Sequence, residues 1–419
     1  MRVHGTIRVP GDKSISHRAL MLAALGDGPS RISGILDSAD VRSTAGVLRT
    51  LGASIPGLSD EFIVEGAGLR GLRAPSSQLD CGNSGTTTRL MSGIVAACPF
   101  SATFVGDDSL SRRPMRRVAR PLEAMGARFD LPPHGGLPMT VHGGSLHDIE
   151  WRSEIASAQV KSALLLAGVV AGVRVTYDEP ARSRDHTERM LGARGVEIRT
   201  EGARVVLSPG RTLRGMDTRV PGDPSSAAFF AALAALADDG HVTLERVCVN
   251  DSRVGFLRVL RRMGATVEHA TETIEGGETV SDVVVSSGGL CGVAVRADEV
   301  PSMIDELPML ACLATRAAGE TVITGAGELR VKESDRIAAV VSNLRALGAD
   351  AEELPDGMRI VGSTSSLRGR IATHGDHRLA MAFGVLGALP GNEIVVDDPG
   401  CVDVSYPGFW RDLSRVSAS

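Results

Sequence analysis

Cationic and hydroxyl side chains gather at one predicted helix start near the beginning of the chain. Residues 13–18 read KSISHR, which places the cations Lys13 and Arg18 and two serine hydroxyls, one of them Ser14, on the opening turn. The N-terminus of a helix carries partial positive charge, and lysine and arginine add full charges that suit phosphate and carboxylate groups. This segment therefore predicts a binding site for an anion.

Comparable polar groups follow at further predicted helix starts and in the loops beside them. They are Asn83, Ser84, Gly85, Thr86, Arg89 and Arg113, then Ser157, Gln159, Lys161 and Arg184, then Asp305, Glu306, Lys332, Glu333 and Arg336, and finally Asp376, His377 and Arg378. Arginine and lysine are the side chains that phosphate and carboxylate recognition requires. Asp305, Glu333 and His377 are the candidate groups for moving protons.

Each of these groups also has a simpler interpretation. A serine or aspartate at a helix start is first of all an N-cap, and the five arginines of residues 112–120 suit a solvated face. The charges at residues 330–336 suit surface ion pairs, and the pair His374 and His377 lacks a third metal ligand at a useful spacing. The site interpretation is favoured because the charged groups occupy matching points of separate repeats.

The residues RVPGD occur twice, at 8–12 and 219–223, which is an offset of 211 residues. Each copy enters an apolar helical pattern that ends in AAL, at Leu25 and at Leu236. The second copy continues as PSSAA and lacks the cations of the first. The chain is therefore a duplication in which the first copy carries the anion site and the second keeps the scaffold.

A finer repeat is the predicted helix end L-x-x-[LM]-G-A. It occurs at residues 48–53, 122–127, 260–265 and 344–349, with a blurred fifth case at 190–193. In each, glycine stands just past the last apolar residue, where a left-handed cap is needed. Alternating β-branched segments follow and predict strands at residues 62–64, 139–141, 205–207, 283–285 and 358–361. A second set of helices precedes those that have these glycine ends. Their predicted starts are Ser14, Ser84, Ser157, Ser226, Asp305 and Asp376.

These spacings predict six units of about 70 residues, each long enough to be a βαβαββ subdomain. We therefore expect an α/β fold of two domains with three units each. The first domain comprises residues 1–11 and 222–419, and the second comprises residues 12–221, with crossings at the two Pro-Gly turns. Helix N-termini that face a cleft between the domains would suit a ligand with several negative charges.

The composition is that of an ordinary globular protein, with 43% hydrophobic residues among 419. A net charge of −5 argues against a nucleic-acid surface, and the apolar runs are too short for a membrane span. The N-terminal residues lack the apolar stretch of a signal peptide. We therefore expect a cytoplasmic monomer that binds small molecules and neither nucleic acid nor membrane. The six cysteines have no C-x-x-C spacing, which favours buried structural thiols.

Several motifs resemble the 5-enolpyruvylshikimate-3-phosphate synthase family over essentially the whole chain. In the family's order they are PGDKSISHRAL at residues 10–20, GNSGTTTR at 82–89, RPM at 113–115, SAQVKS at 157–162, RVKESDR at 330–336 and GDHR at 375–378. The resemblance implies two inverse α/β domains of three βαβαββ units, with helix N-termini facing the cleft between them.

The resemblance also implies a reaction of the shikimate pathway, which leads to aromatic amino acids. The enolpyruvyl group of phosphoenolpyruvate is transferred to the 5-hydroxyl of shikimate 3-phosphate through a tetrahedral intermediate, with release of phosphate and with no metal or organic cofactor. By similarity, phosphoenolpyruvate is held by Lys13, Gly85, Arg113, Gln159, Arg336 and Arg378. Shikimate 3-phosphate is held by Lys13, Ser14, Arg18, Ser157, Gln159, Arg184, Asp305 and Lys332.

Three residues are implied to act in the chemistry itself. Asp305 is the expected base on the 5-hydroxyl, and Glu333 is the expected proton donor and acceptor at the methylene carbon. Lys13 is expected to neutralise charge where the two substrates meet.

The chain departs from one branch of the family. Ala158 replaces a second serine, residues 183–186 replace a segment that contains tyrosine, and Val404 replaces a lysine, which leaves one phosphate contact unassigned. These segments resemble another branch, some members of which tolerate the inhibitor glyphosate. The alanine linked to tolerance is absent, because Gly85 stands there, and we expect this chain to be sensitive.

Two alternatives have different functions. An enolpyruvyl transferase acting on a UDP-sugar shares the fold and the donor, but that family has Lys-Asn where this chain has Lys13 and Ser14, and a reactive cysteine where this chain has Arg113. The other alternative is an anion-binding protein without catalysis on the same scaffold. Loss of turnover in Asp305→Ala would separate this second alternative from an enzyme.

Overall fold

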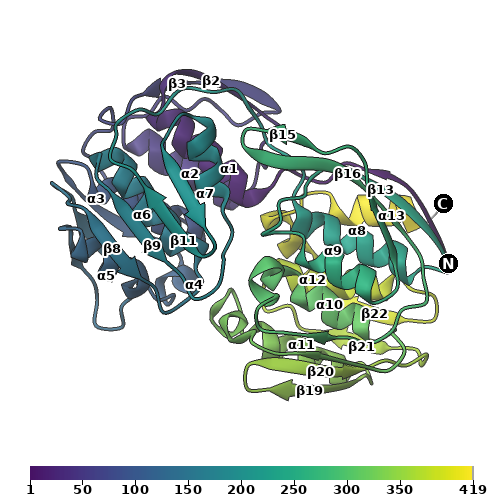
Figure 1. The fold of residues 1–419 in the computed structure, drawn as a ribbon. Helices are drawn as coiled ribbons and strands as arrows, with labels where there is room; N and C mark the ends of the chain where they lie inside the picture. The colour runs from purple at the N-terminus through teal and green to yellow at the C-terminus, as the bar shows by residue number, and fades with distance from the viewer. Residues whose placement is uncertain (418–419) are drawn as a thin grey trace. The chain divides into compact units, whose positions relative to one another are not determined.

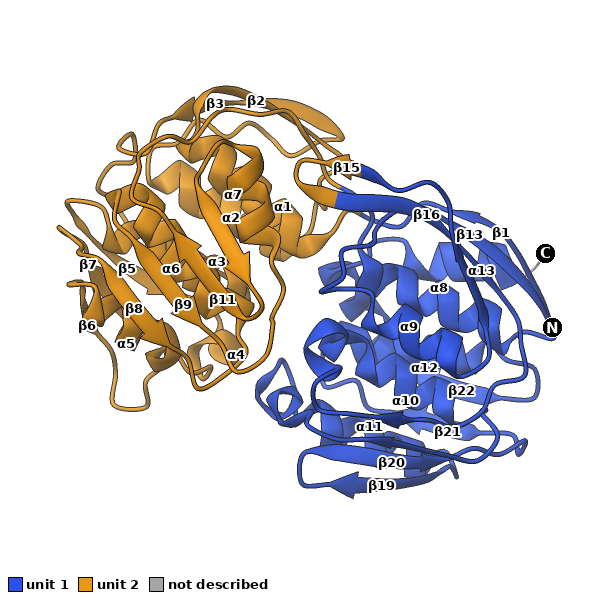
Figure 2. Cartoon of the chain, viewed as in Figure 1, with its two compact units in different colours: residues 1–10, 221–273, 279–419 blue, residues 11–220, 274–278 orange. Residues whose placement is uncertain are grey.

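The computed structural model describes residues 1–417, which form two compact units (Figures 1 and 2). Unit 1 comprises Met1–Pro10, Pro221–Thr273 and the chain from Thr279 onward, and unit 2 comprises Gly11–Val220 and Ile274–Glu278. The chain thus changes unit inside both RVPGD copies. The excursion of Ile274–Glu278 into unit 2 has no signal in the sequence, because it belongs to an ordinary polar hairpin.

Unit 2 contains three small sheets and the helices that connect their strands. The strand orders are β12-β2-β3, β4-β5-β7-β6 and β10-β11-β9-β8. The strands are β2 (Asp27–Ser33), β3 (Glu61–Ala67), β4 (Leu79–Asp80), β5 (Ser101–Val105), β6 (Arg128–Asp130), β7 (Met139–His142), β8 (Ile149–Arg152), β9 (Val175–Asp178), β10 (Ile198–Glu201), β11 (Arg204–Leu207) and β12 (Thr218–Arg219). The helices are α1 (Lys13–Leu25), α2 (Ala39–Thr50), α3 (Gly85–Ala96), α4 (Asp108–Ser111), α5 (Arg116–Ala124), α6 (Ala158–Ala171) and α7 (His186–Ala193).

Unit 1 also contains three sheets. Their orders are β1-β13-β16-β14 with β15 on β16, β17-β18-β20-β19, and β21-β22. The strands are β1 (Arg2–Ile7), β13 (Asp239–Cys248), β14 (Thr266–His269), β15 (Thr273–Glu275), β16 (Glu278–Ser286), β17 (Ala294–Val295), β18 (Glu320–Ile323), β19 (Asp350–Leu354), β20 (Gly357–Val361), β21 (Arg368–Ile371) and β22 (Glu393–Val396). The helices are α8 (Pro224–Leu236), α9 (Gly255–Arg262), α10 (Leu307–Ala314), α11 (Arg336–Ala346), α12 (His377–Gly387) and α13 (Phe409–Ser417), with 3-10 turns η1 (Val300–Ser302), η2 (Ile304–Glu306), η3 (Gly327–Val331) and η4 (Pro399–Val404).

The RVPGD copies each connect a strand of one unit to a helix of the other. Strand β1 pairs in parallel with β13 in unit 1, and the chain then enters α1 of unit 2; β12 pairs in parallel with β2, and the chain then enters α8 of unit 1. A Cβ at Gly11 would lie 2.1 Å from the carbonyl oxygen of Gly34, so only glycine fits the first turn. The duplicated motif is therefore a crossing between units.

Four of the five predicted glycine helix ends are confirmed. Gly52, Gly126, Gly264 and Gly348 have positive φ, and the alanine after each donates its N–H to the carbonyl of the leucine five residues earlier. That bond is the closing contact of a Schellman cap. The fifth prediction, at residues 190–193, is wrong. There the helix continues past Gly192 to Ala193, and the glycine with positive φ is Gly195, three residues after Gly192. The closing bond runs from the Val196 N–H to the carbonyl of Leu191.

The predicted strands are confirmed within β3, β7, β11, β16 and β20, whereas three of the six helix starts differ from the prediction. Ser84, Ser157 and Asp376 are N-caps, as expected. For α1 and α8 the cap is an aspartate, Asp12 or Asp223, so Ser14 and Ser226 lie inside their helices. Asp305 lies in the 3-10 turn η2, because Pro308 suits the first turn of α10.

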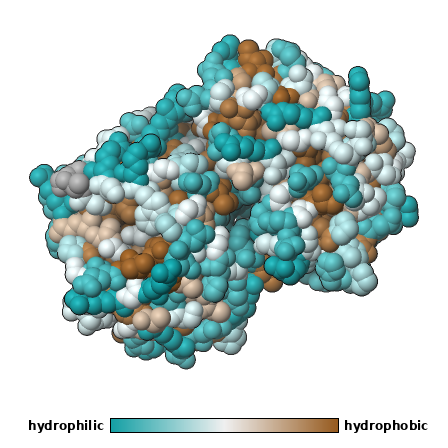
Figure 3. Space-filling view, turned by 180° about the vertical axis from the view of Figure 1, so that it is seen from behind, coloured by the Kyte–Doolittle hydropathy of each residue, from teal (hydrophilic) through white to brown (hydrophobic). Residues whose placement is uncertain are grey.

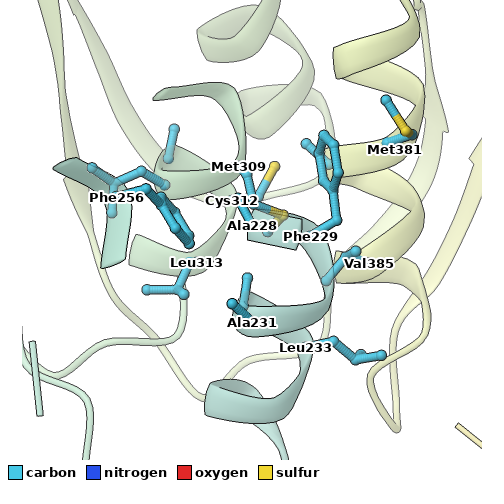
Figure 4. Packing of buried hydrophobic residues seen from close by; sticks show 14 of the residues in the cluster. Ala228, Phe229, Ala231, Leu233, Phe256, Met309, Cys312, Leu313, Met381 and Val385 are labelled. Carbon is cyan, nitrogen blue, oxygen red and sulfur yellow. The ribbon is translucent and has the colours of Figure 1, made fainter. Parts of the chain in front are cut away.

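The centre of unit 1 consists of α8, α10 and α12, which pack against one another (Figure 4). Helix α8 has apolar residues on all sides, as a helix with no solvent face requires. Phe229 of α8, Cys312 of α10 and Val385 of α12 are fully or almost fully buried, at 2%, 0% and 0% exposure. In unit 2, α3 and α6 form the closest helix pair. The helices α3, α6 and α12, which carry candidate site residues at their N-termini, are thus themselves packed in the interior of their units.

The outer surface is mixed. On the face shown in Figure 3, hydrophobic residues form separate patches among hydrophilic ones. Within residues 1–417, no helix combines the length and the apolar character needed to cross a bilayer.

The prediction of buried thiols is correct for Cys81, Cys98, Cys248 and Cys312 and wrong for the other two, since Cys291 is exposed and Cys401 is partly exposed. Both of these lie in loops or 3-10 turns of unit 1, outside the helical core.

Candidate functional site

In unit 1, Asp305 lies among three cations. Its carboxylate is 3.2 Å from Arg336 Nη1, 3.6 Å from Lys332 Nζ and 3.9 Å from Arg378 Nη2. Arg378 Nη1 also donates to the Asp305 carbonyl oxygen over 3.2 Å. The side chain of Asp305 is 12% exposed, so these charges act through little solvent. All three cations were candidates from the sequence, and the structure brings them together around one carboxylate.

Arg336 links this carboxylate to a second one. Its Nη2 donates to Glu333 Oε2 over 2.7 Å, and Glu333 remains 28% exposed. Glu333 and Asp305 thus share a guanidinium that stays protonated at any working pH. Such a pair of carboxylates can transfer protons at two atoms of a bound substrate, while the arginine between them stays positively charged.

A buried ion pair fixes Arg336 itself. Arg336 Nε lies 2.8 Å from Asp376 Oδ2, and the two side chains are 1% and 0% exposed. Burial lowers the pKa of Arg336, but Asp376 and Glu333 outweigh it and raise that pKa above its usual range. Burial raises the pKa of Asp376, and the neighbouring Arg336 outweighs it and lowers that pKa. Asp376 also caps α12 through the Arg378 N–H, so one carboxylate orients both arginines.

In unit 2, Arg18 has a comparable central place. Its Nε donates to Thr187 Oγ1 and its Nη2 to Ser162 Oγ, each over 2.7 Å, and its Nη1 donates to the Ser14 carbonyl oxygen. Burial lowers the pKa of Arg18 to about 10 against the opposing effect of Glu188, and the charge of Arg184 lowers it further. The charge of Arg184 thus acts on Arg18, so both candidate arginines belong to the same part of unit 2.

Lys13 lies at the start of α1 and pairs with a residue that the sequence did not single out. Its Nζ is 3.0 Å from Asp40 Oδ2 in α2, and the two side chains are 18% and 12% exposed. Beneath them, His17 Nδ1 lies 2.6 Å from Thr44 Oγ1. Thr44 in turn contacts Thr87 Oγ1 over 2.7 Å, and Thr87 contacts the Ser84 cap. This line of hydroxyls joins the starts of α1 and α3.

Gly85 opens α3 within reach of two arginines. A Cβ added there would lie 2.8 Å from Arg89 Nη1 and 3.5 Å from Arg113 Nη1. Arg89 Nη1 donates to Gln159 Oε1 over 2.6 Å, and Gln159 Nε2 donates to Thr86 Oγ1 over 3.0 Å. The α3 and α6 helices carry neutral serine caps, which leave their positive N-terminal ends without a carboxylate cap. This arrangement suits an anion.

Some candidates do not join these clusters. Lys161 is enclosed, with its Nζ 2.8 Å from both Glu179 and Glu188 and 1% of its side chain exposed. Burial lowers its pKa, but the two carboxylates outweigh it and raise that pKa. Lys161 is therefore structural. Ser157 acts as the α6 cap through the Val160 N–H. His377 is 2% exposed beside Asp376, inside the protein rather than at the surface of the cluster.

Sequence reasoning missed Asp40, and it undervalued Arg89. No local pattern marks Asp40, because it meets Lys13 only through the packing of α1 on α2. Arg89 was found within the GNSGTTTR motif, but its role as the partner of Gln159 depends on a contact across 70 residues. The fourth predicted unit also differs from expectation. Its helix start has no cation in the sequence, yet the cation Arg253 lies buried against Ser225 there, together with Glu306.

The EPSP synthase (3-phosphoshikimate 1-carboxyvinyltransferase) family model matches residues 1–413. The chain belongs to this family. It is 48% identical to the 3-phosphoshikimate 1-carboxyvinyltransferase of Sulfurihydrogenibium sp. (strain YO3AOP1), over 99% of this chain and 98% of that one. It is 51% identical to the protein of the same name from Alkalilimnicola ehrlichii, over 97% of this chain and 92% of that one.

A solved structure of the EPSP synthase from Acinetobacter baumannii has the same fold. It superimposes with a TM-score of 0.87 at 40% identity, and the match covers 99% of this chain and 95% of the other. The predicted two-domain α/β fold and the predicted EPSP synthase family are thereby confirmed. The UDP-sugar transferase alternative is not favoured by these matches.

Proposed function

We propose that this chain transfers the 1-carboxyvinyl group of phosphoenolpyruvate to the 5-hydroxyl of shikimate 3-phosphate. The observation that carries the proposal is the set of three cations around the Asp305 carboxylate, one of which also pairs with Glu333, on a chain of this family. In the balanced reaction a C–O bond forms between the 5-oxygen and C2 of the donor, and the bond from C2 to the phosphate oxygen breaks. The proton of the hydroxyl leaves with phosphate.

The proposed proton transfers use the two carboxylates of unit 1. Asp305 accepts the proton of the 5-hydroxyl as that oxygen attacks C2, and Glu333 donates a proton to C3. The tetrahedral intermediate then loses phosphate, and Glu333 takes a proton back from the methyl group. The shared guanidinium of Arg336 supports this division of roles, because it stabilises the charged form of either carboxylate while the other is protonated.

The anionic groups of the substrates would be held by the cations described above. We propose that Arg18 and Arg184 bind the phosphate of shikimate 3-phosphate, with Ser14, Ser157, Gln159 and Lys332 as further contacts. Phosphoenolpyruvate would be bound by Arg113, Arg336, Arg378 and Gln159 and by the backbone at Gly85. Lys13 would meet both substrates. The buried, oriented guanidiniums of Arg18 and Arg336 support these roles, because a preorganised donor loses little entropy on binding.

We also propose that the chain acts as a monomer in the cytoplasm with these two metabolites as its partners. Within residues 1–417 only four large hydrophobic side chains are exposed, at Ile63, Ile274, Val331 and Val395. Single exposed hydrophobic residues of this kind do not make a subunit interface. Sedimentation at micromolar protein concentration should give one species of the monomer mass.

The reaction can be tested by its product. Incubation of the purified chain with both substrates should give, by NMR, the two vinyl protons of an enol ether on the 5-oxygen. Replacement of shikimate 3-phosphate by UDP-N-acetylglucosamine should give no such product. An enol ether on the UDP-sugar, or none with either acceptor, would contradict the proposed function.

A further inference from the structure

Four buried polar side chains gather at the start of α8 in unit 1. Arg253 Nη2 donates to Ser225 Oγ over 2.9 Å and to Asp223 Oδ1 over 3.0 Å. Ser225 Oγ in turn donates to Glu306 Oε1. Their exposed fractions are small, at 6% for Asp223, 2% for Ser225 and Arg253, and 1% for Glu306. None of these residues belongs to the set assigned above to substrates or proton transfer.

This cluster occupies the place in the duplication that corresponds to the anion site at α1. The first RVPGD copy leads to Lys13 and Arg18 at a helix start, and the second leads to Pro224 and Ser225. In unit 1 the chain itself places two carboxylates at that helix start, the Asp223 cap and Glu306. A buried carboxylate is costly unless it is fully hydrogen-bonded, and Glu306 Oε2 is buried with no hydrogen-bond partner among the described residues, which points to a role beyond packing.

The position of Glu306 suggests that role. Glu306 and Asp305 are successive residues of η2, a 3-10 turn of three residues that has no side-chain cap of its own. Consecutive Cα atoms are about 3.8 Å apart, so a shift at Glu306 moves Asp305 almost equally. One side chain of the turn is tied to α8, and the next lies against Lys332 and Arg336. The bond at α8 thus restrains the turn that carries Asp305.

We propose that Glu306 is a positioning residue, whose bond to Ser225 at the start of α8 fixes the turn that aims Asp305. The inference rests on the proposed function, because it assigns Asp305 the role of base. A general base must stay within hydrogen-bond reach of the proton that it removes, and displacement of about 1 Å is enough to cost about 100-fold in rate. Glu306 acts only through Asp305 and touches no substrate.

The test removes the Ser225 hydroxyl and leaves both carboxylates in place. Ser225→Ala should lower kcat at least about tenfold, with the KM of each substrate changed less than about threefold, because the groups that bind anions are intact. Ser281→Ala is the matched control, since Ser281 is also a buried serine of unit 1, 3% exposed, that bonds a backbone carbonyl. It should keep the wild-type kcat.

A role through Asp305 also predicts non-additivity. In an Asp305→Ala background, Ser225→Ala should reduce the residual rate by less than about twofold, because the group that it positions is gone. An equal fractional loss in both backgrounds would overturn the proposal, as would a wild-type kcat in Ser225→Ala.

Glu306→Gln provides a second variant if Ser225→Ala does not fold by circular dichroism. It keeps the shape of the side chain and should also lose kcat with little change in KM. Retention of the wild-type kcat in Glu306→Gln would overturn the proposal. Failure of the proposed function is a different result, since wild type would then form no product from the two substrates.

Discussion

The guanidinium of Arg336 lies 3.2 Å from the carboxylate of Asp305, and that arginine is only 1% exposed. A fixed positive charge at this distance favours the carboxylate form of an aspartate, which is the form that can accept a proton. Because Arg336 is held from behind by Asp376, it cannot follow a substrate away from the carboxylate. The relationship makes Asp305 the residue whose loss should separate binding from turnover.

Asp305→Ala should lower kcat about 1000-fold, within the usual range for loss of a general base. Binding of shikimate 3-phosphate should weaken less than about tenfold, because the arginines at the start of α1 and in the 183–186 segment remain. Single-turnover kinetics and equilibrium binding would measure the two effects. Asp350→Ala, at a side chain that is 64% exposed, is the matched control. Turnover that survives with intact binding would refute the assigned base.

Glyphosate should inhibit the wild-type chain, and Gly85→Ala should raise the inhibition constant about tenfold or more. The added methyl would lie 2.8 Å from Arg89 Nη1, which must move and disturb its bond to Gln159. One methyl in a close-fitting pocket can account for a tenfold change. Gly144→Ala is the control, because a Cβ there meets nothing within 4 Å. Equal inhibition constants for wild type and Gly85→Ala would contradict the prediction.

The stability of the chain should fall in mild acid because of His17. Burial lowers the pKa of His17 from 6.5 to about 3, so between these values the unfolded chain binds a proton that the folded chain does not. Stability is therefore lost as the pH falls through this window, by about 2 kcal/mol between pH 7 and pH 5. Urea unfolding of wild type and His17→Gln at both pH values tests this. An unchanged pH dependence in the variant would be the contrary outcome.

The glycine caps offer a test of the fold. Gly52 ends α2 with a φ of +88°, and an added Cβ would make only ordinary contacts of 3.6 Å or more. Gly52→Ala should destabilise by about 1 kcal/mol through its backbone conformation alone. Gly46→Ala, inside the same helix and with nothing within 4 Å, should stabilise by up to about 1 kcal/mol. Urea unfolding of wild type and both variants measures the changes in unfolding free energy. Changes of the same sign for Gly52→Ala and Gly46→Ala would count against the cap.

Local patterns account for what the sequence predicted well. The glycine of each L-x-x-[LM]-G-A end closes the helical turn formed by the four residues before it, so four caps could be located without tertiary contacts. The helix starts were harder, because Asp12 and Ser14, or Asp223 and Ser226, are all acceptable caps and only the turn geometry selects one.

The members of the candidate site could be predicted from the sequence, but the contacts between them could not. Asp305, Lys332, Arg336 and Arg378 were each named from sequence, yet their convergence depends on how η2, α11 and α12 pack. The pairing of Lys13 with Asp40, and the burial of Lys161 between two glutamates, follow from long-range packing that leaves no local trace. Charge alone could not distinguish the enclosed Lys161 from Lys13, the candidate for binding a ligand.

The central claim is that this chain transfers one group between two small anions, and release of phosphate tests it most directly. Phosphate should appear when phosphoenolpyruvate and shikimate 3-phosphate are supplied together, and not with phosphoenolpyruvate alone. Changes in either unit, Arg18→Ala or Asp305→Ala, should each suppress this release. Release from phosphoenolpyruvate without the acceptor, or no release with both substrates present, would contradict the account.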